Sequence, residues 1–135
     1  MNRVFADSSA IIAYFCKRDE NHLTVAAGIE RLRDEDRRMI LTDYIFDECI
    51  TGIMSSAGHA QASMAGQFIL GSSIISVVWL DQDIKLRAWD YFVRHNDKGY
   101  SFTDCTSFIL MKEMKLTHCL AFDKHFEQAG FRLYS

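Results

Sequence analysis

The chain has 135 residues, of which 49% are apolar and 24% charged, and its formal net charge is −3. This length fits one domain, predicted here as residues 1–135, and the apolar fraction excludes a disordered chain. The small negative charge argues against a nucleic-acid binder that relies on a broad basic face, but not against an enzyme that holds a phosphodiester through metal ions.

Strands and helices are predicted to alternate along the chain. Short apolar runs indicate strands, and apolar positions that recur every three or four residues indicate helices. We expect strands at residues 4–6, 39–41, 74–80, 118–122 and 131–134, and helices at 8–16, 20–33, 44–56, from 59 onward, 81–95 and 101–114. This order predicts an α/β fold, a three-layer sandwich around a central parallel sheet of about five strands.

The longest uncharged stretch, residues 60–80, contains several polar side chains and is interrupted at Gly71-Ser72-Ser73. We therefore interpret it as two elements and not as a membrane span. The N-terminal residues lead directly into a short strand and lack a secretory signal pattern. A cytoplasmic protein that does not enter the membrane is the expectation.

Four carboxylates stand out because they lie at the ends of predicted strands or in the first turns of predicted helices. Asp7 and Asp123 end predicted strands, Glu48 lies in the first turns of a helix that follows a strand, and Asp104 begins a later helix. Functional sites of parallel sheets form beyond the carboxyl ends of the strands, so all four are expected near one edge. Each also has a structural explanation: Asp7 as the cap of the helix that follows it, Asp123 as the cap of a turn at residues 124–126, Asp104 in a capping box with Ser101, and Glu48 as a solvated acid.

Considered together, the four acids indicate a metal site. Carboxylates crowded at one edge repel one another and favour uptake of a proton or a cation. Oxygen ligands suit Mg²⁺ or Mn²⁺, and such ions polarise phosphoryl oxygens and activate water. The four cysteines lack the spacing of a zinc site. Phosphodiester cleavage is the chemistry that this pattern favours.

Four motifs follow one another along the chain: VFADSSA at residues 4–10, LTDYIFDE at 41–48, SFTDC at 101–105 and LAFDKHF at 120–126. In these motifs the chain resembles the PIN-domain ribonucleases, and most of all the VapC-type toxins of prokaryotic toxin–antitoxin pairs. The resemblance implies that the catalytic and metal-binding acids are Asp7, Glu48, Asp104 and Asp123. It also implies that Ser9 supports the metal or a water. Asp47 adjoins Glu48, and the spacing after Thr42 favours Glu48.

The resemblance further implies a metal-dependent endoribonuclease with Mg²⁺ or Mn²⁺ as cofactor, RNA as substrate, a small antitoxin as partner, and a homodimer. In the family, the helices expected here at 20–33, 44–56 and from 59 onward form the dimer face and the antitoxin groove. Two alternatives are an RNA-processing PIN nuclease outside a toxin pair and a non-catalytic PIN-like binding module. The presence of all four acids argues against the second.

Two other α/β classes fit less well. A receiver-like phosphoacceptor needs paired acids early in the chain and a lysine after its last strand, whereas Lys124 directly follows Asp123. An Asp-x-Asp phosphatase needs a second aspartate at the position that Ser9 occupies.

Overall fold

Five strands form one sheet in the order β3-β2-β1-β4-β5, and every neighbouring pair is parallel. The structure is a computed structural model that describes residues 2–134, so Met1 and Ser135, the ends of the predicted domain, lie outside the described residues. The strands are β1 Arg3–Ala6, β2 Arg38–Thr42, β3 Ile75–Val78, β4 His118–Leu120 and β5 Arg132–Leu133. The predicted parallel sheet of about five strands is confirmed.

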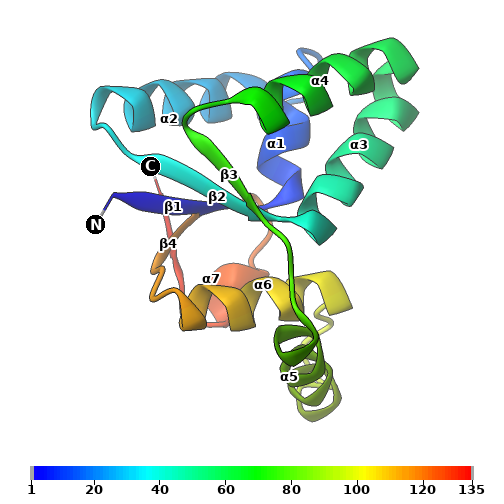
Figure 1. Ribbon diagram of the computed structural model, residues 1–135, viewed down its shortest axis with the longest axis vertical. Helices are drawn as coiled ribbons and strands as arrows, with labels where there is room; N and C mark the ends of the chain where they lie inside the picture. The colour runs from blue at the N-terminus through cyan, green and yellow to red at the C-terminus, as the bar shows by residue number, and fades with distance from the viewer. Residues whose placement is uncertain (1, 135) are drawn as a thin grey trace.

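Helices cover both faces of this sheet, which makes the three layers predicted from the sequence (Figure 1). One layer contains α1 Ser8–Phe15, α2 His22–Asp34, α3 Asp43–Ala57 and α4 His59–Gly71. The other contains α5 Gln82–Arg94, α6 Phe102–Glu113 and α7 His125–Gln128. Among residues 2–134, no helix is both long enough and apolar enough to cross a membrane.

The core lies on both sides of the central strand β1, whose residues Val4, Phe5 and Ala6 are fully buried. A parallel strand covered on both faces needs such a continuous apolar run. Below the sheet, the Phe5 and Phe126 rings lie 6.0 Å apart, and the Phe126 ring meets the edge of Phe108 at 5.0 Å. These contacts attach α6 and α7 to the sheet.

Three strands are shorter than predicted, and β5 keeps only Arg132–Leu133 of the predicted 131–134. The other two stop because a neighbouring strand ends. The predicted strand 118–122 ends at Leu120, which pairs with Ala6, and the chain of β1 turns into α1 immediately afterwards. The backbone N–H of Phe122 instead donates to the Ser9 hydroxyl at 3.3 Å. Likewise, the predicted strand 74–80 stops at Val78, the partner of the last residue of β2.

Capping side chains mark the starts of α3 and α5. The Thr42 side chain accepts the N–H of Ile45 and begins α3, and Asp81 caps α5 in the same way. Helix α7 corrects the sequence interpretation, in which residues 124–126 were only a turn. A short helix forms there because the buried Phe126 holds the segment against α6 and β1.

Candidate active site

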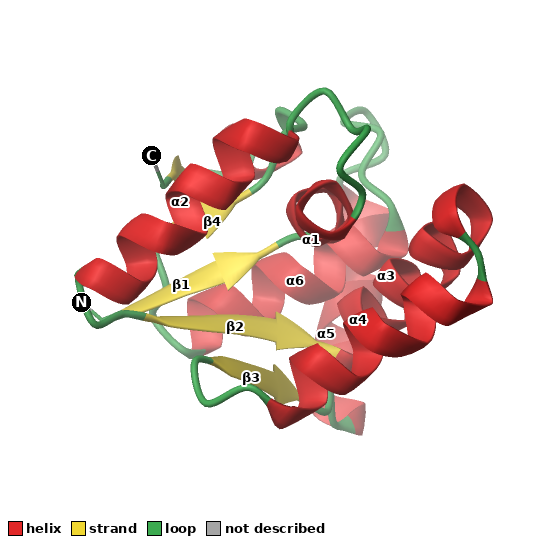
Figure 2. Ribbon diagram, turned by 90° about the horizontal axis from the view of Figure 1, so that it is seen from above, coloured by secondary structure: helices red, strands yellow, loops and turns green. Residues whose placement is uncertain are grey.

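The predicted acids come from four different elements at the carboxyl-terminal edge of the sheet. In Figure 2, β1, β2 and β3 point in the same direction, and α1 and α3 begin beyond their ends. Asp7 follows β1 directly, Glu48 lies in the second turn of α3, and Asp104 lies in the first turn of α6. Asp123 was predicted to end β4, but it lies three residues beyond it, in the loop before α7.

Asp7 is a buried acid with a raised pKa. The residue is only 5% exposed, and its carboxylate accepts a hydrogen bond from the Ser9 hydroxyl at 3.0 Å. Burial raises the pKa of Asp7 to about 7, the negative charges of Asp123 and Asp104 add to the rise, and the bond from Ser9 opposes it. The side chain makes no capping bond to α1, so the cap role considered for Asp7 is not observed.

Asp104 caps a helix and also lies close to Asp123 and His125. Its Oδ2 accepts the backbone N–H of Ser101 at 3.1 Å, while the Ser101 hydroxyl accepts the N–H of Asp104 at 3.0 Å. This is the capping box that the sequence indicates. The same Oδ2 lies 2.9 Å from Nδ1 of His125. Ligand atoms of Asp104, Asp123 and His125 all lie within 4.8 Å of one another.

Asp123 is held near Asp7 by a loop that is bonded to the start of α1. The Leu120 carbonyl accepts the N–H of Asp7 at 2.9 Å, and Ser9 accepts the N–H of Phe122 while it donates to Asp7. The Asp123 carboxylate accepts the N–H of His125 at 3.0 Å, which is the turn cap considered from the sequence. Ser9 therefore connects the ends of β1 and β4.

Glu48 lies outside the group that Asp104, Asp123 and His125 form. Its Oε1 accepts the Ser8 hydroxyl at 2.9 Å, so it is connected to Asp7 through the adjacent residue. Within residues 2–134, the group of ligand atoms that lie within 4.8 Å of one another does not include Glu48 or Asp7. The neighbouring Asp47 is exposed, whereas Glu48 is half-buried.

Sequence reasoning did not assign roles to two residues of the site. Ser8 lies in the first motif without an assigned role, although its hydroxyl donates to Glu48. His125 lies in the fourth motif without an assigned role, although its ring contacts Asp104. Its position two residues after Asp123 was a signal, but the direction of the ring depends on α7, which was not predicted.

The chemistry of the donor set fits a divalent cation. Asp7, Asp104 and Asp123 provide carboxylate oxygens, the ligands that hard cations prefer. Their mutual repulsion is visible in the raised pKa of Asp7, and a cation would relieve it. Asp7, Asp104 and Asp123 therefore have the composition and electrostatics of a site that could bind a divalent metal ion.

Comparisons with known proteins agree with this geometry. The model of the family described as "PIN domain" matches residues 4–132. The 23S rRNA-specific endonuclease VapC20 of Mycobacterium tuberculosis is 31% identical over 129 residues, which cover 95% of each chain. A VapC ribonuclease of Archaeoglobus fulgidus is 24% identical over 122 residues, covering 89% of this chain and 76% of that protein. The crystal structure of VapC20 of M. tuberculosis, described as a sarcin–ricin loop cleaving toxin, matches this fold with a TM-score of 0.84 at 29% identity, and the match covers 95% of each chain.

Proposed function

This chain belongs to the PIN domain family, among its VapC-type ribonucleases, and on that premise we propose that it is a metal-dependent endoribonuclease and the toxin of a toxin–antitoxin pair. The observation that carries the proposal is the grouping of three acids: ligand atoms of Asp104 and Asp123 lie within 4.8 Å of one another, and the charges of both acids help to raise the pKa of the buried Asp7. We further propose that the protein acts in the cytoplasm, where its RNA substrate is found.

Each acid has a proposed role toward Mg²⁺ or Mn²⁺. Asp7, Asp104 and Asp123 hold the ion, and Ser9 orients Asp7 by donating a hydrogen bond to it. When bound, the ion supplies Lewis-acid chemistry: it polarises a phosphoryl oxygen and lowers the pKa of water. Glu48, held by Ser8, holds a second ion or orients the attacking water. The expected products are a 5′-phosphate and a 3′-hydroxyl.

Calorimetric titration tests the metal site. Wild-type protein should bind Mg²⁺, and Asp7→Asn should weaken binding because it removes one charged ligand. Asp97→Asn is a matched control, since Asp97 is an exposed loop acid. Equal Mg²⁺ affinity in wild type and Asp7→Asn would defeat the assignment of Asp7.

The cleavage reaction is tested by mapping the ends of a cut RNA. A 23S rRNA fragment is the first substrate to try, because the relative from M. tuberculosis is named as a 23S rRNA-specific endonuclease. Cutting should require Mg²⁺ or Mn²⁺ and stop with EDTA. A 2′,3′-cyclic phosphate, or cutting that survives EDTA, would contradict the mechanism. RNA binding without cleavage in any divalent metal would favour the non-catalytic alternative.

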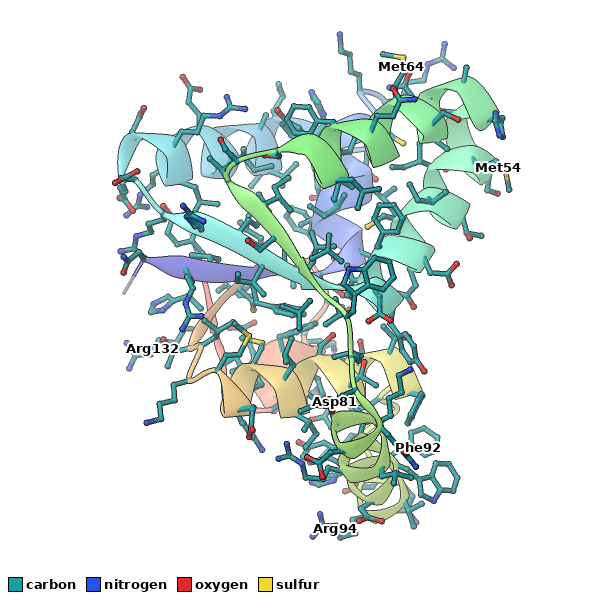
Figure 3. All side chains as sticks on the ribbon, in the orientation of Figure 1. Met54, Met64, Asp81, Phe92, Arg94 and Arg132 are labelled. Atoms are coloured by element: carbon teal, nitrogen blue, oxygen red, sulfur yellow. The ribbon has the colours of Figure 1, made fainter. Side chains whose placement is uncertain are left out.

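A groove lined by both apolar and polar side chains supports the proposed antitoxin partner. A cavity of about 890 Å³ lies between the end of α1 and the outer ends of α3 and α4, and its lining includes Ile12, Phe15 and Met64. Met54 and Met64 project outward from α3 and α4 (Figure 3). An amphipathic segment of an antitoxin would cover such a surface. Loss of antitoxin binding in Met64→Glu, with RNA cleavage retained, is the expected result.

Further exposed apolar side chains support a homodimer. The helices expected to form the dimer face end with α4, but α5 and the residues before it also carry exposed apolar side chains: Trp79, Leu86, Trp89, Phe92 and Val93. Sedimentation velocity should detect a dimer that Trp89→Glu weakens. A wild-type protein that sediments only as a monomer at high concentration would remove the self-pairing proposal.

A further inference from the structure

His125 contacts two of the acids through different atoms. Its backbone N–H donates to Oδ1 of Asp123 at 3.0 Å, and its ring Nδ1 lies 2.9 Å from Oδ2 of Asp104. The two acids belong to different elements and are connected through this one residue at the start of α7.

We propose that His125 is a positioning residue that holds Asp104 and Asp123 together before the cation binds. The inference rests on the proposed metal site and deepens it. Asp104 and Asp123 carry like charges whose ligand atoms lie within 4.8 Å, so repulsion favours their separation toward water. A donor to each carboxylate offsets that repulsion and limits the rotation of both side chains.

The surroundings of His125 hold its ring in place. Helix α7 is anchored by the fully buried Phe126, the next residue in the chain. The imidazole lies edge-on to the Tyr100 ring, with the centroids 5.3 Å apart. Oδ2 of Asp104 is already fixed by the Ser101 N–H, so Oδ1 is the Asp104 oxygen that these two bonds leave for a cation.

A direct ligand role for His125 is less consistent with the hydrogen bond. If Nδ1 donates its proton to Asp104, Nδ1 has no lone pair to offer a cation, and only Nε2 keeps one. Hard cations such as Mg²⁺ also prefer oxygen ligands to imidazole. Residues that hydrogen-bond to metal ligands typically change metal affinity by about 10–100-fold when they are mutated.

Two substitutions separate hydrogen bonding from packing. The amide nitrogen of His125→Asn can replace Nδ1 as a donor, whereas His125→Phe keeps a ring against Tyr100 but has no donor. Both keep the backbone N–H that binds Asp123. In Mg²⁺ titrations we expect His125→Asn to stay within about threefold of wild type and His125→Phe to lose about 10-fold or more, with little change in Tm.

A double-mutant cycle tests whether the effect passes through Asp104. His125→Phe should cause no further loss of Mg²⁺ affinity in the Asp104→Asn background. Wild-type affinity in His125→Phe would overturn the proposal. So would equal losses in His125→Asn and His125→Phe with both proteins folded, because that pattern indicates direct ligation.

A metal-free measurement keeps this inference separate from the proposed function. Nitrogen NMR of the imidazole at pH 8 in EDTA should show a proton on Nδ1 of His125, and Asp104→Asn should remove or weaken that signal. An unprotonated Nδ1 in the wild type would overturn the proposed hydrogen bond from His125 to Asp104, whether or not Mg²⁺ binds. A protonated Nδ1 in a protein that does not bind Mg²⁺ would instead support the hydrogen bond to Asp104 and refute the metal site. It would then also refute the role of His125 in metal binding.

Discussion

Replacing Asp7 with asparagine should stabilise the metal-free protein, and the gain should grow with pH. In the folded chain the pKa of Asp7 is about 7, against a usual value of 3.8, because the carboxyl is buried and faces Asp123. Between these pH values the folded state keeps a proton that the unfolded state has lost. The free energy of unfolding therefore falls as pH rises through this window, and above about pH 7 the loss is complete. Asparagine has no such charge to bury.

The size of the effect follows from the two pKa values. Each pH unit between them changes the free energy of unfolding by about 1.4 kcal/mol, so the whole window corresponds to about 4 kcal/mol. Between pH 5 and pH 8.5, the stability of Asp7→Asn relative to wild type should therefore rise by about 3 kcal/mol.

Urea unfolding in EDTA at pH 5 and pH 8.5 measures this difference directly. Asp97→Asn, which changes an exposed carboxylate, should show no comparable pH dependence. A stability difference between Asp7→Asn and wild type that is the same at both pH values would refute the buried-charge explanation. At pH 8.5, Mg²⁺ at 100 times its Kd should stabilise wild type by about 2.7 kcal/mol and the variant by less.

Three further predictions concern the framework of the site. Thr42→Ala should destabilise the protein by about 1 kcal/mol in urea unfolding, because it removes the cap of α3 that places Glu48, whereas Thr42→Ser should be nearly neutral; equal losses would argue against the cap. Gly52→Ala should be less stable than Gly71→Ala in the same assay, since its Cβ would lie 2.6 Å from the Ile12 side chain, which must shift, whereas the Cβ of Gly71→Ala meets nothing; equal stabilities would contradict this packing. A thiol reagent at pH 8 should label only Cys16 in the native protein, because the other three cysteines are buried; mass spectrometry that detects early labelling elsewhere would contradict this packing.

The sequence alone was enough to predict the fold class and which acids to consider. Apolar runs of strand length alternate with helical periodicity, and this local pattern is sufficient to predict a parallel sheet between two helical layers. Asp7, Glu48 and Asp104 stand next to strand or helix ends that could be read from the residues themselves. The capping box of Ser101 and Asp104 was also predictable, because both partners lie within one helical turn.

The tertiary structure decided where the strands stop and which side chains meet. Strand β4 ends at Leu120 because its partner β1 turns away at Asp7, and that information lies more than a hundred residues away in the sequence. The ring of His125 reaches Asp104 because the adjacent Phe126 is buried in the core and holds α7 in place. The pKa of Asp7 likewise depends on the neighbours that surround it after folding. Local spacing cannot specify these features, because each arises from contacts between segments distant in the sequence.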